Sequence, residues 1–319
     1  METFFVMGKN VLLFVALALP GFFLVKGKIL KEEHSGILSL FLMKIAFPMM
    51  IFHGTVTKIQ LTGATFGSVA TGAVIALLGL SLSALLAVLL TGGIRDEKRR
   101  GMMRFCANIP NNGFLGIPLG LAVFGGDSPV MAPLISINII TTVFLYTVGI
   151  YFVSGDKGAI SPKKALLSPA LLSFVAGIVV NLSGLGELVP EIGTFAGHFS
   201  AMVTPLSMTV LGMKMAAAGW KRVFTGGHLP AVSLMKLILF PAVVLGLLLC
   251  LRPLLPAILT REIMLAAFVS FAMPTAGLAP TLADTYGGSV DEAVSATMGT
   301  TLLSIATIPL LYLGFTLLI

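Results

Sequence analysis

Ten long apolar runs divide the 319-residue chain, and they constrain its fold more than any other feature. A helix needs about 20 apolar residues to cross roughly 30 Å of hydrocarbon, and the runs are close to that length or longer. Strands are not expected, because the runs do not alternate between apolar and polar residues. The sequence therefore predicts an all-α membrane protein with ten transmembrane helices, at about 9–25, 35–57, 65–91, 102–124, 129–153, 169–188, 192–217, 229–251, 262–284 and 291–318.

Composition excludes several classes of protein. Hydrophobic residues make up 57% of the chain and charged residues only 10%, whereas soluble domains carry about 25% charged residues. A cytosolic enzyme, a nucleic-acid binder and a disordered chain are excluded, and we attribute the net charge of +7 to basic loops on anionic lipid headgroups. The two cysteines and four histidines show no disulfide framework or metal-ligand spacing, so no metal or other cofactor is expected.

The links between the runs predict the orientation of the chain, because cytoplasmic loops are rich in Lys and Arg. Twelve Lys and Arg residues lie in links that follow odd-numbered runs, against four on the opposite side. Both termini are therefore expected outside the cytoplasm, in a multi-pass protein of the cell (inner) membrane. No basic segment or cleavage site accompanies the first run, which indicates a retained helix rather than a signal peptide.

Two similar motifs lie 164 residues apart, about half the chain. The first reads NIPNNG at 108–113 with FGG at 124–126, and the second reads AMPTAG at 272–277 with YGG at 286–288. They fall in the fourth and ninth runs, so a five-helix unit enters the membrane from the opposite side when it repeats. This pattern predicts a 5+5 inverted repeat, a common construction among transporters. The expected units are residues 1–153, a cytoplasmic linker at 154–168, and residues 169–319.

The prolines of the two motifs predict broken helices. Proline removes a backbone N–H group and clashes with the carbonyl four residues earlier, and freed backbone groups within a membrane must line a cavity or meet protein. We therefore expect helices four and nine to break and cross near the midplane, with helix N-termini that favour a carboxylate; a simple kink at each proline is the alternative. The candidate substrate-binding residues are Asn108, Pro110, Asn111, Asn112, Pro274 and Thr275.

The motifs resemble those of the auxin efflux carrier family. The segment NIPNNGFLGIPLGLAVFGG at 108–126 is similar to the fourth-span motif of the family, and FAMPTAGLAPTLADTYGG at 271–288 to the ninth-span motif. In the second run, Ser35-Gly36, Pro48 and Phe52-His53 resemble the same carriers. The resemblance covers nearly the whole chain and implies a fold like that of the bile-acid and sodium–proton antiporter group.

The resemblance also implies how such a fold works. Runs 1, 2, 6 and 7 would form a scaffold, often a dimer interface, so that a homodimer is expected, while runs 3–5 and 8–10 would form a moving transport domain. The substrate carboxylate would lie near Asn111, and Asn138 on the fifth run would add a contact. Bacterial members are associated with malate, malonate and similar carboxylates, and plant members with indole-3-acetate. The long cytoplasmic loop of many plant members is missing here, which favours a prokaryotic-type carrier.

Ionisable residues inside the runs are candidates for coupling or gating, because charge is costly in lipid. Lys44 and Lys236 either attract an anion or extend their ammonium groups to the surface. Asp284 is either a proton carrier or ion ligand, or an ordinary carboxylate at a helix end. His53 either titrates near neutral pH or packs through a hydrogen bond. No Asp or Glu lies within five residues of either motif proline, so sodium coupling and midplane proton coupling are not expected, and facilitated export or coupling through Asp284 remains open.

Together these features predict a secondary transporter of small organic anions, working as an exporter or facilitator by alternating access. The expected substrates are mono- or dicarboxylates or auxin-like acids, and the expected partners are this solute and the lipid bilayer, with no nucleic acid. A ligand sensor or channel on the same fold is one alternative, and an intramembrane enzyme is another. No Asp-rich motif or Ser–His pairing stands out in the sequence, so we do not expect an enzyme.

Overall fold

The computed structural model describes residues 9, 12–13, 16–57, 63–159, 167–218 and 228–319. In these residues all regular structure is helical, apart from one isolated β-bridge. Part of the first apolar run and residues 160–166 of the predicted linker lie outside the described residues.

Five helical segments in the described part of the chain are long and apolar enough to cross a membrane, judged by length and composition. They are His34–Thr57, Thr65–Leu90, Met131–Ser154, Leu229–Leu251 and Val290–Thr316. Shorter apolar helices run over Asn112–Phe124 and Leu171–Leu182. The helical architecture agrees with the predicted membrane protein, whereas the count of ten crossings and the inverted repeat stay predictions.

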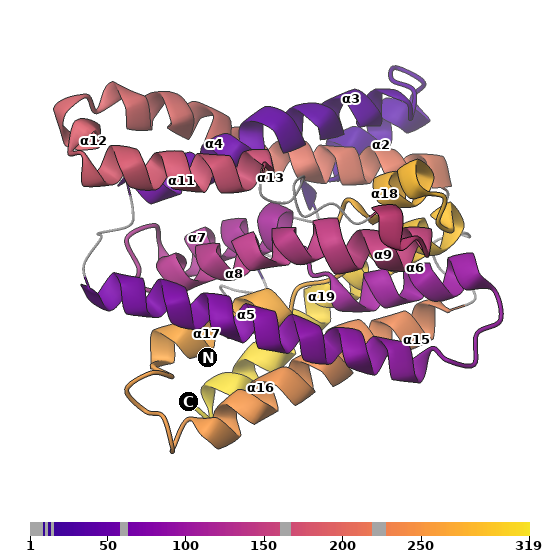
Figure 1. Ribbon diagram of the computed structural model, residues 1–319. Helices are drawn as coiled ribbons and strands as arrows, with labels where there is room; N and C mark the ends of the chain where they lie inside the picture. Colours follow the sequence, from indigo (N-terminus) through magenta and orange to yellow (C-terminus); the bar gives the residue numbers. More distant parts are fainter. Residues whose placement is uncertain (1–8, 10–11, 14–15, 58–62, 160–166, 219–227) are drawn as a thin grey trace.

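One layer of the molecule gathers helices from both halves of the chain, at the top of Figure 1. It contains α2 (Leu19–Lys26), α3 (His34–Phe41), η1 (Leu42–Ala46), α4 (Phe47–Thr57), α11 (Pro169–Leu182), α12 (Leu185–Leu188) and α13 (Glu191–Ala218). Helix α4 packs on α11 and α13, and α13 also packs on α2. The contact of α2 with α13 is close because Gly21 lies against the backbone of Thr209, and Gly212 against that of Ala18.

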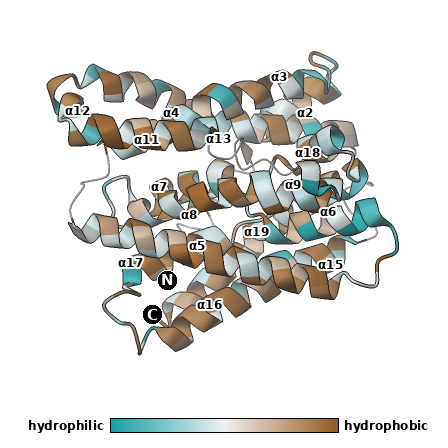
Figure 2. Ribbon diagram, viewed as in Figure 1, coloured by the Kyte–Doolittle hydropathy of each residue, from teal (hydrophilic) through white to brown (hydrophobic). Residues whose placement is uncertain are grey.

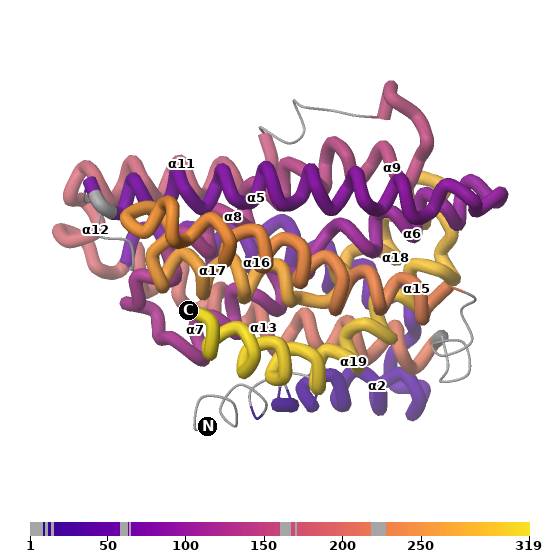
Figure 3. The backbone as a smooth tube through the Cα atoms, turned by 90° about the horizontal axis from the view of Figure 1, so that it is seen from below, coloured from indigo at the N-terminus to yellow at the C-terminus, as the bar shows by residue number. Residues whose placement is uncertain are grey.

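The second layer holds the remaining long helices and lies below the first in Figure 1. Its first part contains α5 (Gly63–Leu90), α6 (Glu97–Asn108), η2 (Asn112–Gly116), α7 (Ile117–Phe124), α8 (Met131–Phe144), η3 (Leu145–Gly149) and α9 (Ile150–Ser154). Its second part contains α15 (Leu229–Leu234), η5 (Met235–Leu239), α16 (Phe240–Leu251), α17 (Arg261–Phe271), α18 (Ala279–Tyr286) and α19 (Val290–Thr316). Helix α5 packs on α8, α6 and α17, and α19 packs on α15 and α6. Seen from below, α5, α16 and α19 follow one another across this layer (Figure 3).

Apolar residues predominate along the helices of both layers (Figure 2), and many of their large side chains are exposed. Phe23 on α2, Leu78 on α5 and Leu310 on α19 are each more than half exposed. Apolar surface of this extent is unfavourable in water and favourable against lipid tails. The exposed faces therefore agree with a location in a membrane.

Helix α6 begins at Glu97, five residues before the predicted start of the fourth run. Its N-cap is Asp96, whose carboxylate accepts a hydrogen bond from the Arg99 N–H group at 3.1 Å. A capping side chain of this kind satisfies a backbone donor that the first helical turn leaves free. The hydropathy of the run could not reveal this start, because the first turn of α6 is polar.

Two prolines widen a helical turn instead of breaking it. Pro48 follows η1, where the Phe47 N–H group bonds to the Leu42 carbonyl five residues earlier. Pro241 follows η5, where Phe240 bonds to Met235 in the same way. Because proline has no N–H group, the preceding turn shifts to the wider π-helical spacing.

The repeated Gly-Gly pairs of the two motifs end the short helices. Gly125 follows α7 with φ 83°, and Gly287 follows α18 with φ 75°. Glycine adopts positive φ without the steric cost that a side chain brings, and it commonly terminates helices for this reason. The first glycine of each pair therefore has a backbone role, which explains its place directly after the aromatic residue.

Replacing Gly101 by alanine is expected to lower the free energy of unfolding by about 2–3 kcal/mol. Gly101 on α6 lies directly against the backbone carbonyl of Phe152 on α9, so a Cβ atom would force the two helices apart. The control is Gly246→Ala in α16, where no described atom beyond the adjacent backbone of the same helix lies within 4 Å of the added carbon. This control is expected to be neutral or stabilising by up to about 1 kcal/mol. Unfolding of both variants in detergent tests the prediction, which fails if they are equally stable.

Candidate functional site

Both predicted helix breaks are present, and they lie side by side. Residues 109–111 separate α6 from η2, and residues 272–278 separate α17 from α18. An isolated antiparallel β-bridge joins Pro110 to Thr275. The two motifs, which lie far apart in the sequence, thus meet at one place within the second layer.

Two backbone hydrogen bonds hold the paired breaks together. The Asn111 N–H group donates to the Pro274 carbonyl at 2.8 Å, and the Ala276 N–H group donates to the Ile109 carbonyl at 3.0 Å. Each broken segment therefore satisfies backbone groups that its own helix has lost, as a low-dielectric environment requires.

Side chains satisfy the carbonyls at the end of α6. The Thr275 hydroxyl donates to the Cys106 carbonyl at 2.8 Å, and the Lys236 ammonium group donates to the Asn108 carbonyl at 3.4 Å. The last carbonyls of a helix lack intrahelical partners and carry the negative end of the helix dipole. Lys236 is 2% exposed, so its positive charge lies at that end in the protein interior.

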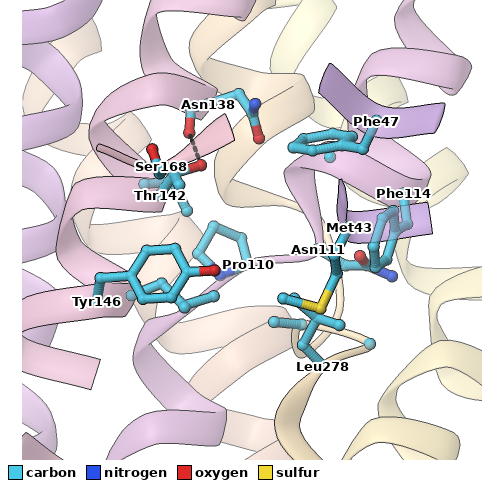
Figure 4. Close-up of a pocket in the computed structure, with 15 residues that line it drawn as sticks. Met43, Phe47, Pro110, Asn111, Phe114, Asn138, Thr142, Tyr146, Ser168 and Leu278 are labelled. Atoms are coloured by element: carbon cyan, nitrogen blue, oxygen red, sulfur yellow. Dashed lines mark hydrogen bonds between the residues drawn. The ribbon is translucent and has the colours of Figure 1, made fainter. Parts of the chain in front are cut away.

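A pocket opens beside the paired breaks, between the two layers (Figure 4). It encloses about 600 Å³ of space free of protein atoms, part of it open to the outside. Met43, Phe47 and Ser168 come from the first layer, and none of the lining residues is acidic or basic. The remaining lining residues are Pro110, Asn111, Gly113, Phe114, Asn138, Thr141, Thr142, Leu145, Tyr146, Ala276, Gly277 and Leu278.

The carboxamide of Asn138 is the most unusual polar group of this pocket. The residue is 2% exposed, and its Nδ2 atom has no hydrogen-bond partner in the described part of the chain. A buried donor without a partner costs about 1–3 kcal/mol. The Asn111 side chain, which also lines the pocket, makes no hydrogen bond to the described residues either. Two carboxamides beside the breaks are therefore available to a ligand.

Backbone donors add to the two carboxamides. Gly113 lies in the first turn of η2 and lines the pocket, and the first N–H groups of a helix have no intrahelical partner. A Cβ atom on Gly113 would lie 2.5 Å from the Phe47 ring, so the ring would have to move if this residue were larger than glycine. The edge-to-face rings of Phe47 and Phe114, with centroids 5.5 Å apart, make the adjoining wall apolar. The pocket thus suits a solute that combines an anionic group with an apolar part.

The structure separates the predicted substrate-binding residues into two groups. Pro110, Asn111 and Asn138 line the pocket, whereas the other four do not. Asn108 donates to the Leu80 carbonyl on α5 at 2.8 Å, and Asn112 donates to the Thr141 hydroxyl on α8 at 3.1 Å. Thr275 donates to the Cys106 carbonyl, as described above. Pro274 contributes its backbone carbonyl to the pairing of the two breaks.

None of the four coupling or gating candidates lines this pocket. His53 on α4 has Nδ1 2.9 Å from the Gly193 carbonyl of α13, an interhelical hydrogen bond. Lys44 and Asp284 are exposed and form no ion pair within the described residues. Lys236 is buried against Asn108, as described above, so its ammonium group does not extend to a surface.

Sequence reasoning missed two buried or half-buried charged residues. Lys214 on α13 donates to the Thr281 hydroxyl of α18 at 2.9 Å. Glu292 on α19 is 4% exposed, with Oε2 3.3 Å from His228 Nδ1 and with Oε1 unpartnered in the described residues. Both charges were visible in the sequence, but no motif marked them, because their burial comes from helices distant along the chain.

Comparison with known proteins agrees with this architecture and finds similarity to membrane transport proteins. Residues 5–162 match the family model described as "membrane transport protein". The chain is 28% identical over 308 residues to an uncharacterized transporter of Methanothermobacter thermautotrophicus, covering 95% of this chain and 96% of that protein. It is also 28% identical over 225 residues to an uncharacterized transporter of Methanocaldococcus jannaschii, covering 66% and 70%. The resemblance to the auxin efflux carrier family is thereby confirmed.

Proposed function

We propose that this protein is a secondary transporter of small organic anions, and that the substrate carboxylate binds in the pocket beside the paired breaks. The observation that carries the proposal is the buried Asn138 amide, which has no partner among the described residues and lies in a pocket that has donors and no acidic side chain. The transporter class itself is supported by the family match.

Each part of the pocket has a role in this proposal. The carboxylate accepts hydrogen bonds from the Asn111 and Asn138 carboxamides and from the free N–H groups at the start of η2. Rotation of a carboxamide by 180° swaps the positions of its nitrogen and oxygen atoms. In this proposal the Asn138 carboxamide is oriented with its NH₂ group toward the solute. The positive end of the helix dipole adds about 0.3–1 kcal/mol to the binding of an anion. The rings of Phe47 and Phe114 contact the apolar part of the solute.

The position of the pocket between the layers supports alternating access. Met43 and Phe47 belong to one layer, and Asn111 and Asn138 to the other. Motion of one layer against the other would open the site to one side of the membrane at a time. In this proposal the layer with α2–α4 and α11–α13 is the scaffold, through which two copies form a homodimer. The layer with α5–α9 and α15–α19 is the transport domain.

The proposed setting is the cell membrane, with both termini outside the cytoplasm. The pocket has no carboxylate that would bind sodium or carry a proton, so we propose facilitated transport or export rather than sodium-driven uptake. This choice is tested together with the substrate in the experiment below.

Counterflow in proteoliposomes tests the proposed function. Vesicles are loaded with an unlabelled acid, and uptake of the same labelled acid is followed for succinate, malonate, butyrate and indole-3-acetate. We expect saturable counterflow of at least one acid, unchanged when sodium is replaced by choline. Protein-free vesicles are the control. A channel would give flux without stimulation by the internal acid, a sensor would bind an acid without flux, and either result would contradict the proposal.

A further inference from the structure

A second pocket adjoins the substrate pocket and contains Lys214. The two pockets share Asn111, Phe114, Gly277 and Leu278. The second pocket encloses about 400 Å³ of space free of protein atoms, part of it open to the outside. Its other walls are formed by serine and apolar side chains of α3, η1 and α13. A solute in the first pocket therefore lies next to the second one.

Lys214 places a positive charge in this second pocket. Its ammonium group has three N–H donors. One of them makes a hydrogen bond to the Thr281 hydroxyl at 2.9 Å. Lys214 forms no ion pair within the described residues, and no acidic side chain lines the pocket. The acidic residue whose charge acts on Lys214 is Glu32, which is exposed in the segment before α3. Glu32 forms no ion pair with Lys214. A cation that is drawn from water without a counter-charge in direct contact is unfavourable, and an anion in the pocket would lower that cost.

The location of Lys214 also links this pocket to the two layers. Lys214 lies on α13 of the first layer, and Thr281 lies on α18 of the second. Ser39 and Ser207, which also line the pocket, have hydroxyls that donate to carbonyls of their own helices. Lys214 is therefore the cationic group of this pocket with donors left for a solute, beside the Asn111 carboxamide that the two pockets share.

We propose that the Lys214 pocket is a second anion subsite, and that it binds a carboxylate beside the one at the paired breaks. The proposal rests on the proposed function and adds a residue that recognises charge. The carboxylate is either the second carboxylate of a dianionic solute that spans both pockets, or the single carboxylate of a monoanion that binds here before it enters the first pocket. In both cases the ammonium group of Lys214 supplies the hydrogen bonds and the counter-charge.

Binding of two acids of equal carbon number tests this subsite. The full-length protein in lipid nanodiscs is titrated with succinate and with butyrate, and the shift of its unfolding temperature gives the apparent affinity. We expect Lys214→Gln to weaken succinate binding at least about tenfold, since it removes charged hydrogen bonds. Lys214→Arg keeps the charge and is expected to retain most of the affinity. Lys157→Gln, which removes an exposed lysine that lines neither pocket, is expected to change nothing.

The outcomes separate the two sources of the carboxylate. If Lys214→Gln lowers the affinity for succinate alone, the result supports one dianion that spans both pockets. If it lowers the affinity for both acids, the result supports a separate binding site for monoanions. Unchanged affinity for both acids overturns the subsite while the proposed function stands. If Asn138→Ala binds succinate normally and the binding still depends on Lys214, the proposed carboxylate site at the breaks fails and the Lys214 subsite stands. If the wild type binds neither acid, the subsite proposal falls, and counterflow of malonate and indole-3-acetate decides the proposed function.

Discussion

Replacing Asn138 by alanine is expected to raise the KM for carboxylate counterflow at least about tenfold. The substitution removes a donor that has no other partner in the described structure, and a hydrogen bond to a charged group contributes about 1.5–3 kcal/mol. Asn111→Ala is expected to act in the same direction, since its side chain also lines the pocket. Initial rates of counterflow at a series of substrate concentrations give the KM of each variant.

Two further variants make this prediction specific. Asn138→Asp sets a like charge against the substrate carboxylate and is expected to have a larger effect than alanine. Asn181→Ala is the matched control, because that carboxamide donates to the Thr55 carbonyl at 2.9 Å and joins α11 to α4 away from the pocket. Equal KM values for Asn138→Ala, Asn181→Ala and the wild type would show that Asn138 does not bind the substrate.

Replacing Lys236 by glutamate is expected to lower the free energy of unfolding by about 3–5 kcal/mol. Lys236 is 2% exposed and its ammonium group meets the Asn108 carbonyl. A carboxylate there would be buried against the negative end of the α6 dipole, in the place of the ammonium group that now meets it. Chemical unfolding in detergent, together with the yield of monodisperse protein, measures the effect.

The control for this prediction is Lys157→Glu, the same charge reversal at an exposed position. Surface substitutions of this kind usually change stability by less than about 0.5 kcal/mol. Lys236→Met removes the buried charge without adding another and is expected to cost less than the glutamate. Similar stability of Lys236→Glu and Lys157→Glu would contradict the buried position of Lys236.

The sequence was sufficient to predict where the helices break. Proline lacks an N–H group in every context, so Pro110 and Pro274 had local consequences that needed no knowledge of the fold. Hydropathy likewise predicted the apolar helices, because membrane-crossing segments differ in length and composition from other helices. Pro48 and Pro241 show the limit of this reasoning, since there the helix continues through a wider turn.

The directions of the side chains beside the breaks could not be predicted in the same way. Asn111 faces the pocket, while its neighbour Asn112 bonds to Thr141 and Asn108 bonds to the Leu80 carbonyl. These directions depend on the backbone angles of an irregular segment, which hydropathy and residue spacing do not specify. Lys214 has the same difficulty, because its position next to the pocket follows from how α13 packs against the second layer.

The central claim is that two interrupted helices meet and that donors beside them bind a carboxylate. Solid-state NMR distance measurement tests it directly, with ¹³C-carboxylate substrate bound in lipid vesicles to protein whose asparagines carry ¹⁵N in the side-chain amide only. A hydrogen bond of ordinary length brings the carboxylate carbon to about 4 Å from an amide nitrogen. We predict a contact at this range that disappears in the double variant Asn111→Ala/Asn138→Ala. Bound substrate with no such contact, or a contact that persists in the double variant, would contradict the account.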